Sequence, residues 1–232
     1  MSTKRRKADT MKNIHRCSAN RLNKFLECPF KLALYNFGIE GRPTDDKYLK
    51  CGKAIHAWIE DSIISESPIS PEDYFYEHEV PDELRERYDT CISTVDSKGI
   101  FGWKGEVEAE KTLQMYFEDG GLLEVEARAD LIRDNGVIYD WKTGKELNKP
   151  EYILQGQLYC HVFGLDKCIF ISLLTGDELE IKAPPNATIR KLLNTYKNAV
   201  NDGNLPKKAK MDDQCVKWCE YYDICNNNDN IE

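Results

Sequence analysis

Two aspartates ten residues apart, on segments that a glycine-containing turn connects, constrain the fold of this chain most. Asp130 lies in the segment 123–132, and Asp140 and Lys142 lie in the segment 137–143. Both segments are rich in apolar residues, and the residues between them are typical of a β-hairpin loop. The sequence therefore predicts two adjacent antiparallel strands that carry an acidic pair and a lysine.

The register of this hairpin decides whether the two carboxylates can share a metal ion. A two-residue turn would place Asp140 on the opposite face from Asp130, because side chains alternate between the faces of a strand. A three-residue loop at 134–136 pairs the two aspartates directly, and its last residue is the glycine that a left-handed position needs. We therefore predict this loop, with both aspartates and Lys142 on one face and Trp141 packed on the other.

This set of side chains suits the hydrolysis of a phosphodiester. Carboxylate oxygens hold Mg²⁺ or Mn²⁺, and the metal lowers the pKa of its water and neutralises charge on the phosphate. Lys142 can orient or deprotonate the nucleophile and can stabilise the pentavalent state. The alternative interpretation is a ladder of charged residues on an exposed sheet face.

Two helical segments carry further polar pairs. His56 and Glu60 share one face of a helix predicted over 52–64, beside its apolar stripe. Gln155 and Tyr159 repeat this spacing in a helix predicted over 150–163. Either pair could line a cleft beside the aspartates. The alternatives are a structural histidine and an ordinary polar edge of an amphipathic helix.

The composition limits the class of protein. The chain has 232 residues, of which 41% are hydrophobic and 31% charged, as in a soluble globular protein rather than a disordered one. A net charge of -8 argues against coating nucleic acid through bulk charge. Residues 169–174 form the longest apolar run, too short to cross a bilayer, and the basic N-terminus lacks the apolar core of a signal peptide. We expect an intracellular protein: cytoplasmic, or in the host cytoplasm if viral.

Nine cysteines in an intracellular chain favour metal ligation over disulfides. Cys215, Cys219 and Cys225 are clustered, and Cys28 is a candidate fourth ligand far upstream. Four thiolates suit a [4Fe–4S] cluster or a zinc ion, and the uneven spacing with one remote ligand favours iron and sulfur. The remaining cysteines are expected to be small buried hydrophobes: Cys17, Cys51, Cys91, Cys160 and Cys168.

The order of predicted elements indicates an α/β fold with a mixed sheet covered by helices. Residues 1–17 are expected to be a disordered basic tail, 18–225 a single domain, and 226–232 a second tail. Pro29 is expected to interrupt the first helix, residues 18–37, at Cys28. Residues 65–82 are expected to be irregular, followed by a helix over 82–96.

Five motifs in order along the chain resemble the RecB-like branch of the PD-(D/E)XK nucleases. The iron–sulfur members of that branch are the nearest likeness: the AddB-type nuclease domains and the CRISPR-associated RecB-like exonucleases. The resemblance covers residues 18–225. The matching motifs are Ser18-Ala19-Asn20-Arg21-Leu22 with Cys28-Pro29, Gly52-x3-His56-x3-Glu60, Asp130 with Asp140-Trp141-Lys142-Thr143-Gly144, Gln155-x3-Tyr159, and the three C-terminal cysteines.

This resemblance implies a restriction-endonuclease-like fold and a set of roles. The metal ligands for Mn²⁺ or Mg²⁺ would be His56, Asp130, Asp140 and the main-chain carbonyl of Trp141, and Lys142 would be the catalytic lysine. Gln155 and Tyr159 would contact DNA or brace the site, and Glu60 would hold His56 or act as a ligand. A [4Fe–4S] cluster on Cys28, Cys215, Cys219 and Cys225 would join the N-terminal helix to the C-terminus. The first cysteine interval is one residue longer here than is usual in the family.

The expected function is a metal-dependent DNA exonuclease that acts on single-stranded DNA or on DNA ends. Its partners would be DNA and a helicase, or another recombination or CRISPR-type protein, that opens the duplex. Two alternatives keep the same fold: a module that binds DNA ends without cutting, and a structure-specific endonuclease. A third alternative is a zinc-stapled domain of unrelated function.

Overall fold

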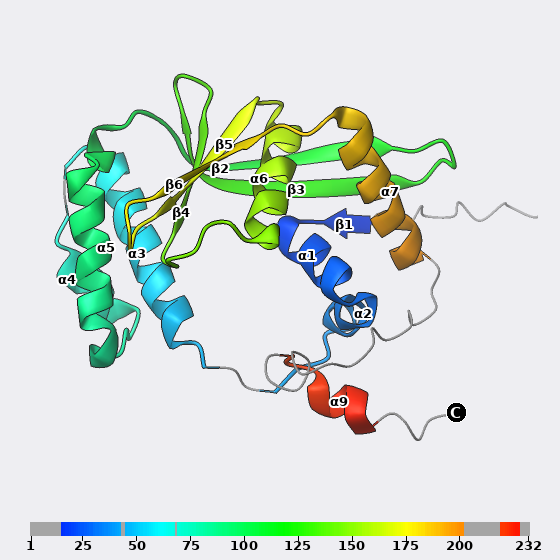
Figure 1. Ribbon diagram of the computed structural model, residues 1–232, viewed down its shortest axis with the longest axis horizontal. Helices are drawn as coiled ribbons and strands as arrows, with labels where there is room; N and C mark the ends of the chain where they lie inside the picture. The colour runs from blue at the N-terminus through cyan, green and yellow to red at the C-terminus, as the bar shows by residue number, and fades with distance from the viewer. Residues whose placement is uncertain (1–14, 43–44, 68, 202–218, 228–232) are drawn as a thin grey trace, which may run out of the picture.

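The computed structural model describes residues 15–42, 45–67, 69–201 and 219–227 (Figure 1). The elements, in chain order, are β1 (His15–Cys17), α1 (Ala19–Glu27), α2 (Pro29–Asn36), α3 (Lys47–Ile64), α4 (Pro71–Glu77), η1 (Asp82–Leu84), α5 (Arg85–Ser97), η2 (Ile100–Gly102), β2 (Gly105–Tyr116), β3 (Leu122–Arg133), β4 (Ile138–Lys142), α6 (Pro150–Phe163), β5 (Lys167–Ser172), β6 (Glu178–Lys182), α7 (Asn186–Asn201) and α9 (Tyr222–Asn227).

Six strands form one mixed sheet within the described residues, as the sequence predicts. β3 is its hub: β2 pairs with it antiparallel along one edge, whereas β1 and β4 pair with it along the other. β5 then pairs parallel with β4, and β6 antiparallel with β5. On this edge, β1 pairs with residues 123–125 of β3 and β4 pairs with residues 131–132. The part of β3 between these two pairings has no strand partner on this edge among the described residues.

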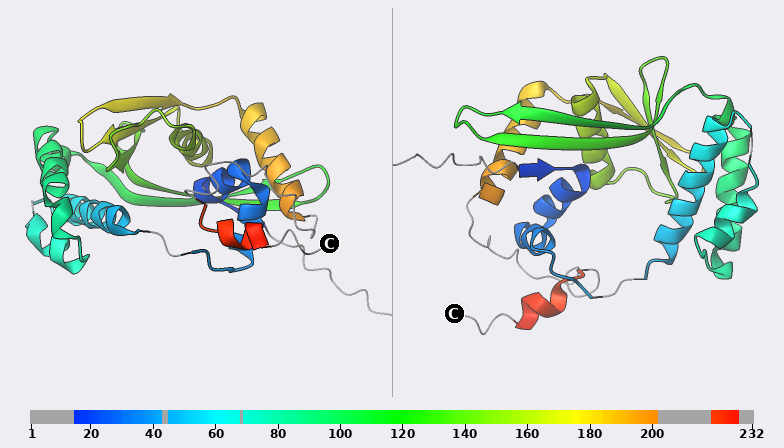
Figure 2. Two further views of the ribbon diagram at one scale, coloured as in Figure 1. Left: turned by 60° about the horizontal axis from the view of Figure 1, so that its bottom comes forward. Right: turned by 180° about the vertical axis from the view of Figure 1, so that it is seen from behind.

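Helices cover both faces of the sheet (Figures 1 and 2). Helices α1, α6 and α7 pack on one face, in a first core cluster with residues such as Val125, Leu158 and Phe170. Helices α3, α4 and α5 pack on the other, in a second core cluster with residues such as Trp58 and Trp141. The alternation of side chains along β4 and β5 divides their residues between the two clusters, so both strands are buried on both faces.

The first helices form as their capping residues predict. The Ser18 side chain accepts a hydrogen bond from the Arg21 N–H at 3.4 Å and caps α1. Cys28, in extended conformation, ends α1 and begins α2, with Pro29 at the first helical position. The predicted interruption at Pro29, with Cys28 at the joint, is confirmed.

Several predicted boundaries were wrong. The predicted disordered tail 1–17 includes His15–Cys17, which form β1, and residues 226–227 of the predicted second tail belong to α9. Part of the segment predicted to be irregular forms α4, because Pro71 suits a first helical position and acidic residues follow it. α3 begins at Lys47 rather than residue 52, and residues 82–84 form a 3-10 turn before α5.

The β2–β3 ribbon bends where the two core clusters meet. Ala127 and Ala129 of β3 pack in the first cluster, whereas Leu131, which has the same strand parity, packs in the second. Opposite this point, Glu108 of β2 adopts a left-handed backbone with φ of 49°. Such a conformation is strained for a residue with a Cβ, and it bends the ribbon beside Asp130.

Gly156 lets α6 lie close to the sheet. A Cβ added there would stand 2.8 Å from Ile181 Cδ1 and 3.1 Å from Phe170 Cε2. Gly156→Ala should therefore lower the free energy of unfolding by about 1–2 kcal/mol, since overpacking outweighs the gain in helix propensity. Gly52→Ala in α3 is the control, because its Cβ would meet only Thr143 Oγ1, at 3.4 Å. Urea unfolding of both variants checks this, and a stabilised Gly156→Ala would contradict the close packing.

The C-terminal segment packs against the first helices (Figure 1). Tyr221 is buried with Phe30 and Leu34 of α2. The Arg42 N–H donates to the Glu220 carbonyl at 2.7 Å, and Lys24 Nζ forms an ion pair with the Glu220 side chain at 2.8 Å. Segments almost 200 residues apart in the sequence are thus held side by side.

Candidate active site

The hairpin has the predicted register. Leu131 pairs with Tyr139 and Ile132 with Ile138, and continuing this register places Asp130 opposite Asp140. The loop contains three residues, and Gly136 within it has a φ of 75°. The predicted loop is therefore confirmed, as is the packing of Trp141 on the opposite face, where it is buried against α3 and α5.

Asp130 lies at the fork where β4 separates from β3. At this fork the Trp141 N–H donates to a side chain of β3 rather than to its main chain. The acceptor is Asp130 Oδ2, at 2.6 Å. Asp130 Oδ1 lies 3.2 Å from Nδ1 of His56, which α3 carries to the site. The carboxylate thus joins the strand fork to the helix on the second core cluster.

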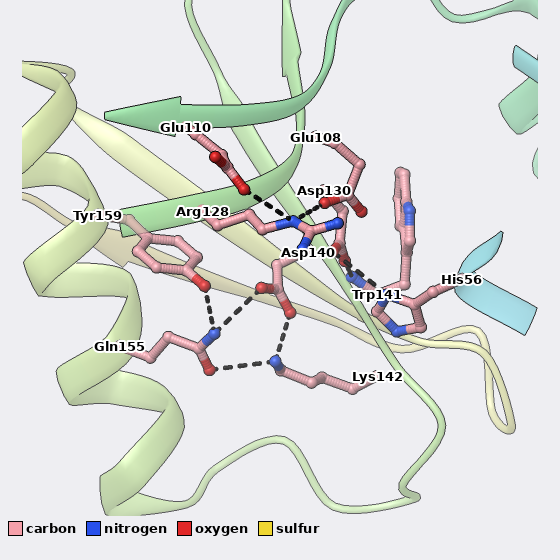
Figure 3. Close-up of polar contacts among 10 residues, drawn as sticks. All are labelled: His56, Glu108, Glu110, Arg128, Asp130, Asp140, Trp141, Lys142, Gln155 and Tyr159. Atoms are coloured by element: carbon pink, nitrogen blue, oxygen red, sulfur yellow. Dashed lines mark hydrogen bonds and ion pairs between the residues drawn. The ribbon is translucent and has the colours of Figure 1, made fainter. Parts of the chain in front are cut away.

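Asp140 belongs to a second network, with α6 (Figure 3). Its carboxylate forms an ion pair with Lys142 and accepts a hydrogen bond from Gln155 Nε2 at 3.2 Å. Gln155 also accepts from Lys142 Nζ at 3.1 Å and donates to the Tyr159 hydroxyl at 2.6 Å. Gln155 therefore braces both charged groups, and Tyr159 fixes the position of Gln155.

These side chains line one cleft of about 660 Å³. The structure brings eight of the site residues proposed from the sequence to this cleft: His56, Glu60, Asp130, Asp140, Trp141, Lys142, Gln155 and Tyr159. Glu60 lines the cleft one turn after His56 on α3, as the sequence predicts.

Among the cleft residues that sequence reasoning missed are Glu108 of β2 and Arg128 of β3. Arg128 forms ion pairs with Glu108 and, at 3.6 Å, with Glu110, both on the neighbouring strand (Figure 3). Burial raises the pKa of Glu108, although Arg128 counteracts this. The missing signal was the pairing of β2 with β3, because its register brings Glu108 opposite Asp130.

The charges of the site shift one another's pKa values. Burial and the neighbouring Asp130 raise the pKa of Asp140 to about 6, although Lys142 opposes the shift. For Asp130, burial is outweighed by His56, Lys142 and the Trp141 N–H, so its pKa is lowered. For Lys142, burial is outweighed by the two aspartates, so its pKa is raised. The site therefore holds one carboxylate that protonates readily and a lysine that is charged at neutral pH.

The pKa of Asp140 in the folded chain is above its ordinary value of 3.8. Deprotonation of Asp140 should therefore destabilise the folded state relative to the unfolded state. Between about pH 4 and pH 6 the folded chain keeps a proton that the unfolded chain has lost. Raising the pH through this window should lower the free energy of unfolding, by at most about 3 kcal/mol. Urea unfolding in a chelating buffer checks this against Asp140→Asn, which lacks the titrating group. If the free energies of unfolding of wild type and Asp140→Asn differ by the same amount throughout this pH window, the predicted contribution of Asp140 is wrong.

The side chains fit a divalent metal by their chemistry, although their arrangement is not that of a metal site. Among the described residues, no group of three or more histidine, cysteine, aspartate or glutamate side chains is placed to hold an ion. The Lys142 ammonium faces Asp140, and His56 faces Asp130. Asp140 Oδ1 is buried, and it is the oxygen that forms the ion pair with Lys142. Two carboxylates and an imidazole around one cleft are the donor types that Mg²⁺ and Mn²⁺ accept.

Three of the four proposed cluster cysteines meet at one place. Cys28, Cys219 and Cys225 pack against the apolar cluster of Phe30, Leu34 and Tyr221. Cys215 lies outside the described residues. The five cysteines expected to be buried are all buried: Cys17, Cys51, Cys91, Cys160 and Cys168.

The structure thus combines a mixed sheet, helices on both faces, and an acidic pair with a lysine at the fork of β3 and β4. The family model of the PD-(D/E)XK nuclease superfamily matches residues 16–226, and the chain belongs to this superfamily. Membership supports a nuclease activity on DNA with divalent metals such as Mg²⁺ or Mn²⁺. No curated protein gives a significant match.

One of the solved structures that the chain resembles supports the fold. The crystal structure of SSO0001 has a TM-score of 0.50 and 17% sequence identity, over 94% of this chain and 89% of that one. An alkaline exonuclease from Laribacter hongkongensis (LHK-Exo) has a TM-score of 0.29 and 16% identity, over 51% of this chain and 63% of that one. In the part of the chain that the structure describes, no helix has the length and apolar character needed to span a bilayer.

Proposed function

We propose that the protein is a Mn²⁺- or Mg²⁺-dependent exonuclease of the RecB-like branch, acting on single-stranded DNA or on DNA ends inside the cell. The observation that carries this proposal is the convergence of Asp130, Asp140 and Lys142 at the fork of β3 and β4, in a cleft that can admit a DNA strand. The motifs around this fork, from residue 18 to residue 225, support the RecB-like assignment and a single domain.

The metal would be held by Asp130, Asp140, His56 and the main-chain carbonyl of Trp141. When bound, it supplies positive charge against the phosphate and lowers the pKa of water. With a cation held there, Lys142 would keep its hydrogen bond to Gln155, and its ammonium would face the substrate.

The chain's own residues position the reaction. Lys142, charged at neutral pH, donates to the scissile phosphate or to the attacking water and stabilises the negative charge of the transition state. Gln155 keeps Lys142 in place through its 3.1 Å hydrogen bond, and Tyr159 keeps Gln155 in place. Asp130 limits the orientation of His56 through its 3.2 Å contact with Nδ1, and Glu60, which lines the same cleft, would hold His56 or act as a further ligand.

A [4Fe–4S] cluster on Cys28, Cys215, Cys219 and Cys225 is the second part of the proposal. Cys28 and Cys219 carry free thiols, and Cys28, Cys219 and Cys225 pack against the same apolar cluster. Thiolates are the usual ligands of such clusters. The cluster would fasten the C-terminal segment to the joint between α1 and α2. The protein partner would be a helicase, or another recombination or CRISPR-type protein. It would separate the strands of duplex DNA for the nuclease.

The test is degradation of labelled DNA in Mn²⁺, compared with the same reaction in EDTA. Linear single strands, end-blocked strands and circular single strands are used in parallel. The proposal expects Mn²⁺-dependent loss of linear strands with free ends and survival of circles. Cleavage of circles would show an endonuclease instead. Binding of linear strands without any cleavage in Mn²⁺ or Mg²⁺ would identify a DNA-end-binding module.

A further inference from the structure

Two neighbouring apolar side chains stand exposed at the rim of the active-site cleft. Tyr48 and Leu49 lie in the first turn of α3, and their residues are 52% and 59% exposed. Both line the cleft that also contains Asp130, Asp140 and Lys142. A tyrosine and a leucine that are exposed side by side lack the stabilisation that burial of their apolar surface would give. Such a pair at the rim of a cleft indicates a surface that binds a ligand.

Cations surround the Tyr48 ring. The guanidinium carbon of Arg87 lies 5.1 Å from the ring centroid. Lys47 Nζ lies 5.5 Å from the centroid, but it forms ion pairs with Asp45 at 3.1 Å and with Glu83 at 2.8 Å. Arg87 also donates a hydrogen bond to the main-chain carbonyl of Thr143, the residue after Lys142. One side chain therefore connects the aromatic ring to the end of the strand that carries the catalytic lysine.

An aromatic ring beside cations is a surface that suits a nucleotide. A base stacks on a face of the ring, and a phosphate next to it is attracted by the Arg87 guanidinium. Lys53 lies one turn further along α3 and lines the same cleft. In duplex DNA the base faces are stacked on each other, so only an unpaired base can offer a face to Tyr48.

We propose that Tyr48 and Leu49 form a stacking rim that binds an unpaired base of the substrate strand next to the cleavage site. This inference rests on the proposed nuclease function. It adds the structural reason why the enzyme would prefer unpaired DNA over duplex DNA. Tyr48 supplies the aromatic face, and Leu49 supplies an apolar contact at its edge. A fully paired end must fray before its strand reaches Lys142.

Binding is tested with fluorescein-labelled dT12 and with a twelve-residue abasic strand, by anisotropy, in the Lys142→Ala background so that the strand is not cut. Tyr48→Ala should weaken dT12 binding about tenfold or more, and Tyr48→Phe should not. Binding of the abasic strand should change less than twofold, since no base is present to stack. Tyr116→Ala is the matched control, because Tyr116 is 64% exposed and lies outside the cleft.

Cleavage in the background with Lys142 intact separates the two proposals. Tyr48→Ala should raise KM for single-stranded DNA with little change in kcat. Equal KM values for Tyr48→Ala and wild type, with cleavage retained, would overturn the stacking rim and leave the nuclease proposal intact. Equal weakening of dT12 and the abasic strand would also overturn it. Stacking without any cleavage by the wild type would keep the rim and overturn the nuclease.

Discussion

Lys142→Ala is expected to lower kcat for DNA cleavage by about 100- to 1,000-fold, because it removes a charged donor from a buried site. Lys142 is 15% exposed at its side chain and is held between Asp140 and Gln155. Its position is therefore fixed before the substrate arrives, and little reorganisation is needed in the transition state. The corresponding loss of transition-state stabilisation is about 3–4 kcal/mol.

Lys53→Ala is the matched control for this experiment. Lys53 lines the same cleft from α3, whereas the ion pairs of the two aspartates are with His56 and Lys142. Its removal should raise KM moderately and leave kcat within a factor of about two. Because Lys142→Ala leaves the Asp140 carboxylate buried without its cation, thermal unfolding of each variant shows whether the fold survives. Lys142→Gln provides a second variant that retains length and a hydrogen-bond donor.

The outcome distinguishes cutting from binding. If Lys142→Ala binds linear DNA as tightly as wild type but does not cut it, Lys142 acts in the reaction. If both proteins release the same amount of labelled product in Mn²⁺, the cleavage does not come from this site. In that case the fork of β3 and β4 is a binding surface, and any observed nuclease comes from a contaminant.

Cys28→Ala is expected to remove almost all the iron from the purified protein and to abolish absorbance near 400 nm. The wild type should carry about four irons per chain and be brown. Structural metal centres contribute on the order of 10 kcal/mol to the segments they join. Loss of the cluster should therefore expose residues 219–227 to protease, because the remaining contacts are few: a small apolar cluster around Tyr221, and the contacts of Glu220 with Arg42 and Lys24.

Cys160→Ala is the control for the cysteine experiment. Cys160 lies on α6 and is buried in the first core cluster, whereas Cys28 and the C-terminal cysteines pack against the separate cluster around Tyr221. This variant should keep its iron and its colour. A colourless wild-type protein with one zinc per chain would contradict the iron–sulfur proposal, as would a Cys28→Ala variant with full iron content.

Local chemistry made the hairpin predictable. The three-residue loop with Gly136 at the left-handed position determines the register, and the register places both aspartates and Lys142 on one face. Helical spacing likewise predicted that His56 and Glu60 share a face, and that Gln155 and Tyr159 do. In each case the signal lies within about ten residues of sequence, where turn geometry and periodicity are decisive.

Features that depend on distant pairing were not predictable in this way. β1 has three residues, too few for a visible alternation, and it forms because the edge of β3 is available to it. Glu108 and Arg128 became site residues only through the register of β2 with β3. The bend at Glu108 needs a left-handed backbone conformation, which a glutamate rarely adopts and which the sequence therefore does not predict.

The packing of α2 against Tyr221 affects how this chain folds as it is synthesised. Phe30 and Leu34 emerge from the ribosome early, but the tyrosine that completes their cluster follows almost 200 residues later in the sequence. Until Tyr221 has been synthesised and has emerged, the apolar surface of α2 lacks this partner and is available to chaperones. A nascent chain that has not reached Tyr221 therefore carries an unprotected α2, even when the residues of its central sheet have all been synthesised.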